Sequence, residues 1–459
     1  MRNSDLYQNM KILVMGMGKS GLSAAKLLLS LGAMVDVYDD IKKKDMDWSA
    51  SPWQDMPVNI FFDYHFFDPS LHQYDLAVIS PGIALDNAFV QIVMDSGVEL
   101  IGEMELGTRL FEGKFIAITG TNGKSTTSSL IHHILVESGQ ESLLAGNIGE
   151  PLTAVVEKST KKTIGVLEVS SYQLETIQSF HPHIALITNI SNDHLARHKT
   201  MEYYCALKAK VFCNQDGRDY VILNAEDERV LHFQNLAPSQ IRYFSTRKPV
   251  SGAYFQDQVL KLKKHDHTYE IVNRNELLLP GLHNVENALG AICVCDILGL
   301  SIAQIRNGIM SFHGVEHRQE IVETIAGVTW INDSKATNTD STIMALNSYD
   351  KPIYVLLGGS PKKTDYSLLA KKIVHQGVIA IVYGQTQKEI VQALEDEGYL
   401  EYRLAKDLFH ACELAKQQAQ VGDIVLLSPA CPSFDSFQNF EHRGQVFKEI
   451  VHAIGKREK

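Results

Sequence analysis

The sequence predicts an α/β protein of three domains: an N-terminal Rossmann-like domain (residues 1–102), a central P-loop-type α/β domain with a β insertion (103–314), and a C-terminal Rossmann-like domain (315–459). Two observations predict this class. Short apolar runs typical of buried strands alternate with helix-length stretches along the chain, and glycine-rich turns join two of these runs to the helices that follow. The length of 459 residues is sufficient for several domains.

The first domain begins with a βαβ unit. Residues 11–40 contain an apolar run, a glycine-rich turn, an amphipathic stretch and a second apolar run. Gly16, Gly18 and Gly21 have the G-x-G-x-x-G spacing of a dinucleotide-binding turn, and Asp39 ends the second run. Taken alone, this pattern predicts NAD. The same turn holds any diphosphate, so the sequence predicts a diphosphate site and leaves the base open.

Further strands and one change of pattern complete the expected fold. In the first two domains, buried strands are expected at 76–80, 115–119, 163–169 and 184–190. Residues 221–280 change to short alternating runs, which predict a β insertion or a sheet edge with a hairpin turn at 265–267. Helical spacing returns at 283–299. The last domain is expected to contain strands at 328–332, 353–358, 379–383 and 424–427.

Composition limits the partners and the compartment. The formal net charge of −11 provides no overall positive field to hold a nucleic acid. The six cysteines form no C-x-x-C pair, which favours a reducing compartment. No apolar run approaches the roughly 20 residues of a membrane span, and the short run at 12–17 lacks a signal-peptide cleavage site. We therefore expect a cytoplasmic protein that binds neither membrane nor nucleic acid.

The strongest local signal is the motif TGTNGKST, which starts before Gly120 at the end of a predicted strand. The turn leads into a helix that opens with Lys124 and Ser125. Backbone N–H groups and the lysine ammonium of such a turn hold a triphosphate, while the serine hydroxyl binds Mg²⁺. Ile118 stands where the standard pattern has glycine, so this is a shortened variant.

Polar side chains follow the next strands of the central domain. Glu168 ends one strand, where it either binds a metal ion that bridges phosphates or caps a helix. His194 follows another strand and is a candidate ligand for Mg²⁺ or substrate, and a tentative proton acceptor. Lys208 is either a solvated surface lysine or an amine that CO₂ carbamylates near Mg²⁺. The sequence alone leaves these alternatives open.

Three polar loops follow predicted strands of the C-terminal domain. They contain Asp333 and Lys335, then residues 358–362, then residues 428–433. Open α/β sheets bind ligands at the carboxyl ends of their strands. The coincidence of three such loops predicts a second part of the site.

A series of motifs spread over nearly the whole chain resembles the Mur ligase family, in the branch that adds D-glutamate. The motifs, in order, are GMGKSG, SPGIAL, TGTNGKST, GNIG, LEVSSYQLE, NDH, GLHNVENAL, the His317-Arg318 pair, NDSKATN and LLSPACPSFDSFQNFEHRG. The resemblance implies an ATP-dependent ligase that joins D-glutamate to UDP-N-acetylmuramoyl-L-alanine through an acyl phosphate in peptidoglycan precursor synthesis. It also implies a cytoplasmic enzyme with ATP and Mg²⁺ as cofactors, which we expect to be a monomer.

The resemblance further implies four sets of site residues. The UDP-substrate set is Gly18, Lys19, Ser20, Asp39, Asp40, Ser80, Asn147 and His194. The ATP set is Gly120, Thr121, Asn122, Gly123, Lys124, Ser125, Thr126, Asn284, Asn287, Arg318 and Asp333. The Mg²⁺ ligands are Ser125, Glu168, His194 and carbamylated Lys208, which alignment on Tyr204 selects over Lys210. The D-glutamate set is Thr337, Lys362, Ser433 and Phe440, and the catalytic residues are Lys124, Glu168, His194, Lys208 and Lys335.

Several alternatives remain. The chain could be another Mur ligase or a folylpolyglutamate-type ligase, although the latter shares the ATP loop without the UDP-binding domain. An NAD-dependent dehydrogenase explains Gly16, Gly18 and Gly21 but not the Lys124 loop. A nucleotide-dependent switch is suggested by the motif at 224–227, Asn-Ala-Glu-Asp, which resembles a guanine-reading motif without its lysine.

Overall fold

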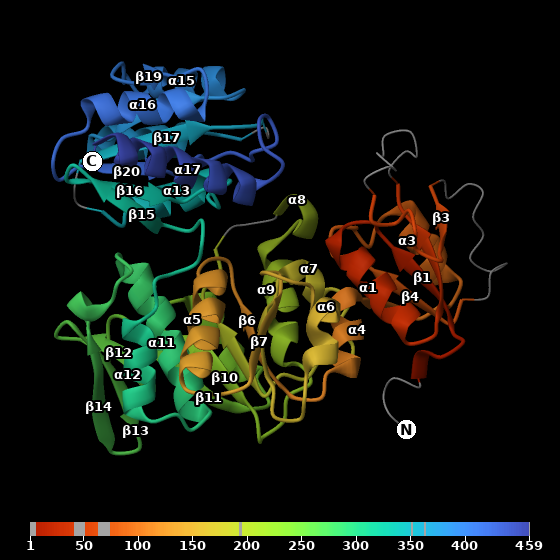
Figure 1. Cartoon of the computed structure of the whole chain (residues 1–459). Coiled ribbons are helices and arrows are strands. Elements are labelled where there is room, and N and C mark those ends of the chain that lie inside the picture. Colours follow the sequence, from red (N-terminus) through yellow and green to blue (C-terminus); the bar gives the residue numbers. More distant parts are fainter. Residues whose placement is uncertain are drawn as a thin grey trace. The chain divides into compact units, whose positions relative to one another are not determined.

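The fold was analysed in a computed structural model, which describes residues 6–40, 51–62, 74–191, 195–349, 352–361 and 364–458. The chain divides into two compact units (Figure 1). The first comprises Met1–Leu277 and His283–Phe312, and the second comprises Leu278–Leu282 and His313–Lys459. Three sheets are present among the described residues, each with helices packed against it. The predicted α/β class is confirmed, while the domain boundaries after 102 and 314 stay predictions.

The N-terminal sheet is five-stranded and parallel, in the order β3-β2-β1-β4-β5. The predicted βαβ unit is confirmed, because β1 and β2 pair in parallel on either side of α1. The strands are β1 (Lys11–Met15), β2 (Met34–Tyr38), β3 (Asn59–Phe61), β4 (Leu76–Ile79) and β5 (Leu100–Gly102). The helices are α1 (Lys19–Ser30), α3 (Ala88–Asp95) and α4 (Glu103–Leu110).

Buried polar contacts join this sheet to the central one. The carboxylate of Glu103, at the start of α4, accepts hydrogen bonds from the backbone N–H of Thr153 at 2.8 Å and from its hydroxyl at 2.7 Å. The Thr153 hydroxyl also lies 2.7 Å from that of Ser23 in α1. Burial raises the pKa of Glu103. These contacts fasten the two sheets into a single compact unit.

The central sheet has nine strands in the order β14-β13-β12-β11-β10-β9-β6-β8-β7. Its strands are β6 (Lys114–Thr119), β7 (Ser142–Gly146), β8 (Ile164–Glu168), β9 (Ile184–Ile187), β10 (Tyr220–Asn224), β11 (Gln240–Ser245), β12 (Gly252–Gln256), β13 (Val259–Lys264) and β14 (His267–Asn273). Its helices are α5 (Lys124–Glu137), α6 (Leu152–Val155), η5 (Val156–Lys158), α7 (Ser171–Leu174), α8 (Leu195–His198), α9 (Met201–Ala209), η6 (Lys210–Phe212), α10 (Glu228–His232), η7 (Phe233–Asn235), η8 (Arg274–Glu276), α11 (Leu282–Ile297) and α12 (Ile302–Met310).

The expected change of pattern after residue 221 is an antiparallel sheet edge. Strands β12, β13 and β14 pair antiparallel, and the predicted hairpin turn contains His265 at a φ of 53°. Strand β9 ends at Ile187, earlier than the expected 190. The backbone beyond it leaves the sheet to hydrogen-bond the turn after β6, as described below.

The C-terminal sheet has six strands in the order β15-β16-β20-β17-β18-β19. Its strands are β15 (Glu320–Ile325), β16 (Val328–Asn332), β17 (Ile353–Gly358), β18 (Ile379–Tyr383), β19 (Arg403–Leu404) and β20 (Ile424–Leu427). Its helices are α13 (Thr339–Leu346), α14 (Ser367–Gln376), α15 (Gln387–Asp396), α16 (Leu408–Gln418) and α17 (Phe440–Glu458). The four expected strands, β16, β17, β18 and β20, are confirmed.

Both faces of this sheet are buried, which explains the continuous apolar runs of its strands. Val355 and Leu357 pack with α13, α14 and α15 on one face. Leu356, which alternates with them along β17, packs with α16 and α17 on the other. Strand β15 was not expected because this antiparallel edge strand, with the sequence Glu-Ile-Val-Glu-Thr-Ile, has neither a continuous apolar run nor a regular alternation of apolar and polar residues.

None of the six cysteines forms a disulfide. Among the described residues, we find no helix with the length and apolar character needed to cross a membrane.

Candidate active site

The phosphate-binding turn predicted at 120–123 joins β6 to α5. Gly123 adopts a φ of 84°, and a Cβ atom there would lie 2.4 Å from Asn287 Oδ1, so both conformation and space require glycine. No side chain caps α5, which leaves the N–H groups of its first turn available to an anion. Ser125 and Thr126 in this first turn are buried. The geometry is that of a phosphate site.

Two lysine amines converge on one carbonyl of this turn. Lys124 Nζ donates to Gly120 O at 3.0 Å and to Thr121 O at 2.7 Å. Lys208 Nζ, from α9, donates to the same Gly120 O at 2.8 Å. Lys208 is only 1% exposed and lies 4.6 Å from the centre of the Tyr204 ring. The alternative of a solvated surface lysine is therefore wrong, and Lys210 instead donates to Glu175 O at 3.2 Å.

Glu168 lies beside the turn because β8 neighbours β6. It pairs with Ile118 in the sheet register, and its side chain is 2% exposed. Asn147 Nδ2 donates to Glu168 Oε1 at 2.8 Å. A residue predicted to bind the UDP-linked substrate therefore contacts one predicted to bind metal.

Sequence reasoning missed two residues that hold the turn from the end of β9. Thr188 Oγ1 donates to Asn122 O at 2.6 Å, and Asn189 Oδ1 accepts from Asn122 N at 2.9 Å. Thr121 N also donates to Asn189 O at 2.8 Å. A polar pair directly after a strand was the available signal, but the expected strand extended over these positions.

Helix α11 supplies the two predicted asparagines. Thr127 Oγ1 donates to Asn287 Oδ1 at 3.2 Å, and Asn287 Nδ2 donates to Asn284 Oδ1 at 3.1 Å. Both asparagines are buried. The start of α11 thus packs beside the first turn of α5, and the structure brings both asparagines to the phosphate turn.

The glycine-rich turn of the N-terminal sheet joins β1 to α1, at the position that the sequence predicts. A Cβ on Gly21 would lie 1.8 Å from Gly16 O, so only glycine permits this approach of helix and turn. Asp39 Oδ2 accepts from Met17 N at 2.6 Å, which means that the acidic residue of the pattern supports the turn itself. Lys19 Nζ donates to Gly149 O at 2.8 Å.

Four more of the residues predicted to contact UDP lie in this turn or close to it: Gly18, Ser20, Asp40 and Ser80. Gly18 and Ser20 flank Lys19 at the start of α1, where no side chain caps the helix. Asp40 accepts from Tyr38 OH and, at 3.0 Å, from Asn87 Nδ2. Ser80 follows β4 and packs against the turn, since its Oγ lies 2.6 Å from where a Cβ of Gly16 would stand.

The C-terminal unit brings the three predicted loops to one edge. Strand β20 lies between β16 and β17, and all three are parallel, so the loops that follow them are neighbours. Asp333 is buried and accepts from Ser428 Oγ at 2.7 Å and from Gln319 N at 3.2 Å. Lys335 Nζ lies 5.6 Å from the centre of the Phe440 ring.

Arg443, which sequence reasoning did not select, organises this edge. Its side chain is fully buried. Its Nε and Nη2 donate to Ser334 Oγ at 3.0 Å and Ser334 O at 2.8 Å, while Nη1 donates to Cys431 O at 3.0 Å. Arg443 therefore fixes the loops after β16 and β20 relative to each other. Its only sequence signal was its place in the last quoted motif.

The other predicted residues of this unit are distributed around the same edge. Ser433 is buried in the loop after β20, Thr337 is half-buried after β16, and Arg318 is half-buried before β15. His194 and Lys362 lie outside the described residues.

We expect the substitution Asp333→Asn to raise the stability of the fold at high pH and to lower the enzymatic activity. Burial raises the pKa of the Asp333 carboxyl to about 7 despite its hydrogen bond from Ser428. The unfolded pKa is about 3.9, so the stability that the protonated acid contributes is complete below that value and is lost as the pH rises through 7. Asparagine stays neutral and can bond both partners. We expect the variant to be more stable than the parent at pH 8, by at least about 1 kcal/mol, and this gain to shrink towards pH 5.

Thermal unfolding at the two pH values checks this prediction, with phosphate release as the second measurement. Activity should fall, because Asp333 belongs to the predicted ATP set. The exposed Asp340 in the first turn of α13 provides the control Asp340→Asn. Lower stability of Asp333→Asn at both pH values would show that the ionised carboxylate is favourable in the fold, through a partner such as Arg318.

Fold and site together define a class: an α/β nucleotide-dependent enzyme whose central sheet carries a phosphate-binding turn. Models of three protein families match the chain in order. They are the Mur ligase MurD-like N-terminal domain over residues 10–102, the Mur ligase middle domain over 118–295, and the Mur ligase glutamate ligase domain over 317–431. The chain belongs to the Mur ligase family.

Relatives and solved structures agree with this membership. A UDP-N-acetylmuramoylalanine–D-glutamate ligase of Koribacter versatilis is 39% identical over 98% of both chains. One of Clostridioides difficile is 36% identical over 97% of this chain and 98% of its own. The UDP-N-acetylmuramate-alanine ligase of Thermotoga maritima shares the fold, with a TM-score of 0.62, 19% identity, and coverage of 97% of this chain and 100% of that one. As a member of this family, the chain is an ATP-dependent, amide-bond-forming ligase, which sets aside the dehydrogenase alternative.

Proposed function

We propose that this chain joins D-glutamate to UDP-N-acetylmuramoyl-L-alanine, with conversion of ATP to ADP and phosphate. The observation that carries the proposal is the convergence of Lys124 and Lys208 on Gly120 O beside the uncapped N-terminus of α5. This arrangement suits a transferring phosphoryl group. The printed activity of the relatives from Koribacter versatilis and Clostridioides difficile supports the choice of substrates.

The reaction requires two steps, because a carboxylate does not react directly with an amine. In the first, a carboxylate oxygen of the muramoyl-alanine attacks the γ-phosphorus, the bond to the β-phosphate oxygen breaks, and ADP leaves. In the second, the neutral amine of D-glutamate attacks the acyl carbon. The bond between that carbon and the phosphate oxygen breaks, phosphate leaves with this oxygen, and the amine loses a proton. The first step brings an anionic carboxylate to an anionic phosphate, so positive charge at the γ-phosphate is the main catalytic requirement.

The residues of the chain divide this work. Lys124 and the N–H groups of the turn hold the β- and γ-phosphates, and Lys335 stabilises the transferring phosphoryl group. The ATP set is completed by Asn284, Asn287, Arg318 and Asp333. The N-terminal turn holds the diphosphate of UDP, with Lys19 beside it. D-Glutamate binds Thr337, Lys362, Ser433 and Phe440. His194 is the candidate that accepts the amine proton.

The donor set around the turn fits Mg²⁺. Ser125 offers a buried hydroxyl and Glu168 a buried carboxylate, and Mg²⁺ prefers oxygen ligands. We propose Ser125, Glu168, His194 and a carbamate on Lys208 as its ligands. Carbamylation joins the amine nitrogen to the carbon of CO₂ and releases two protons from the ammonium form, so a cation that is costly to bury becomes an anion that a bound Mg²⁺ would neutralise. When bound, Mg²⁺ supplies charge neutralisation for the phosphates.

Phosphate release from ATP by the purified protein tests the proposed function. With UDP-N-acetylmuramoyl-L-alanine present, we expect release with D-glutamate and none above background with L-glutamate or without an amino acid. Release that requires another amino acid would favour another Mur ligase, and release that requires a folate would favour the folylpolyglutamate-type alternative. We place the activity in the cytoplasm, where ATP is available, and propose that the chain acts as a monomer.

A further inference from the structure

The motif at 224–227, which the ligase chemistry does not use, lies where β10 ends beside β9. Asn224 Nδ2 donates to Thr188 O at 2.9 Å, and Asn224 Oδ1 accepts from Glu226 N at 2.9 Å. Asp227 Oδ2 accepts from Ile190 N at 2.6 Å. The first and last residues of the motif therefore both bind the backbone of segment 188–191.

Segment 188–191 also forms hydrogen bonds with the phosphate turn. Besides the bonds from Thr188 and Asn189 described above, Ser191 N donates to Thr121 Oγ1 at 3.0 Å. Thr121 and Asn122 of the turn are thus bonded to three residues of this segment, Thr188, Asn189 and Ser191. A displacement of the segment would pass directly to the N–H groups that hold phosphate.

We propose that Asn224 and Asp227 are positioning residues that set the conformation of the ATP-binding turn through segment 188–191. The inference rests on the proposed function only in that the turn binds ATP. Neither side chain contacts the turn itself in the bonds described, so each acts through another residue. The motif at 224–227 would thus support phosphate binding, and it would not recognise a guanine base.

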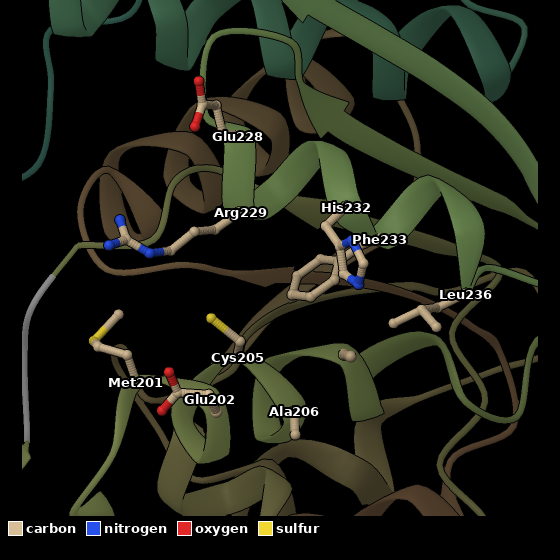
Figure 2. Close-up of a pocket in the computed structure, with 10 residues that line it drawn as sticks. Met201, Glu202, Cys205, Ala206, Glu228, Arg229, His232, Phe233 and Leu236 are labelled. Atoms are coloured by element: carbon tan, nitrogen blue, oxygen red, sulfur yellow. The ribbon is translucent and has the colours of Figure 1, made fainter.

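Two features surround α10: apolar packing of Val230 in the core of the central sheet, and a pocket on the side of α9. A pocket of about 520 Å³ separates α9 from α10 and η7 (Figure 2). Figure 2 shows Cys205 directed into this pocket from α9 and Phe233 facing it from the other wall. Two polar contacts connect α10 to segment 188–191. Asp227 accepts from Ile190 N, and Arg229 Nη1 donates to Ile190 O at 3.4 Å.

The two oxygens of Asp227 have separate tasks, which allows a sharp experiment. Oδ1 caps α10 by accepting from Arg229 N at 2.9 Å and Val230 N at 3.1 Å, whereas Oδ2 accepts from Ile190 N. Asp227→Asn can keep the cap with its oxygen but presents an NH₂ group to Ile190 N. Asn224→Asp likewise keeps the acceptor for Glu226 N and loses the donor to Thr188 O. Each variant removes one tie with almost no change in shape.

We expect both variants to bind ATP more weakly, with KM for ATP raised about tenfold for Asn224→Asp and severalfold for Asp227→Asn. KM for D-glutamate should stay within twofold. The melting temperature of Asp227→Asn should match that of the control, whereas that of Asn224→Asp should be lower, because its buried carboxylate faces Thr188 O. The control is Asp407→Asn, which alters an N-cap aspartate of α16 that accepts from His410 N at 2.9 Å. The control should leave KM for ATP unchanged.

A fluorescent ATP analogue, titrated without the acid or the amino acid, gives the binding constant directly. This measurement tests the inference independently of the proposed substrates, because ATP affinity can be measured even if D-glutamate is not a substrate of the enzyme. In a further variant, Asn189→Ala removes a tie between the segment and the turn, so adding Asn224→Asp to it should weaken binding less than it does in the parent. An unchanged ATP affinity in Asn224→Asp and Asp227→Asn overturns the proposal. So does an equal loss of affinity for all substrates with a lower melting temperature, which would indicate general destabilisation.

Discussion

Lys124→Ala is expected to reduce ATP-dependent phosphate release to background, a loss of at least about 100- to 1,000-fold. The Lys124 ammonium already lies over the phosphate turn, bonded to Gly120 O and Thr121 O. When ATP binds, the ammonium can leave these carbonyls and bond to oxygens of the β- and γ-phosphates. It then stabilises the negative charge of the phosphoryl group during transfer. Alanine supplies neither charge nor donor, and water that enters in its place screens the field less effectively than a fixed cation.

The fold should tolerate this substitution. Lys124 Nζ donates to two backbone carbonyls of its own turn, and its side chain is half-buried. Lys114→Ala is a matched control, because Lys114 lies at the opposite, exposed end of the same strand β6. Both variants should unfold near the parent temperature, and Lys114→Ala should retain full activity. A Lys124→Ala enzyme with more than about a tenth of the parental rate would contradict the phosphate-binding role of the turn.

Much of the fold was accessible from the sequence because both faces of its parallel strands are buried. Runs such as 353–358 and 424–427 are continuously apolar, and the structure places them as β17 and β20. Glycine was equally informative where geometry demands it. Gly123 requires a positive φ and Gly21 a close approach of backbone, so both turns were located correctly. The antiparallel strand β15 was not predicted because polar residues interrupt its apolar ones and only Ile325 of its six residues is buried.

The candidate site was predictable only where its residues belong to a recognisable local pattern. Arg443 could not be selected, because its function depends on two loops that lie far apart in the sequence and meet in the sheet. Thr188 and Asn189 were assigned to a strand, because a polar pair after an apolar run does not by itself show that the pair bonds a turn about 65 residues earlier in the chain. Asp333 was expected at a strand end, but its burial, and hence its raised pKa, depends on packing around Ser428.

Lys208→Ala is expected to abolish phosphate release as well, but with partial recovery in short carboxylates such as acetate. Lys208 is buried, and its amine lies on Gly120 O at the centre of the phosphate turn. If CO₂ converts this amine to a carbamate, alanine removes an anionic metal ligand and leaves a space that a small carboxylate can occupy. The comparison is acetate against chloride at equal ionic strength, with phosphate release as the measurement.

Recovery distinguishes the two chemical states of this lysine. If Lys208 acts as a carbamate, acetate should restore activity and methylamine should not, because the missing group is an anion. If it acts as an ammonium beside the phosphates, methylamine should restore activity and acetate should not. Lys210→Ala is the neighbouring control, since its amine donates to Glu175 O away from the turn, and it should remain active in chloride. A fully active Lys208→Ala enzyme would remove Lys208 from the metal site altogether, and the buried amine would then serve only to brace Gly120.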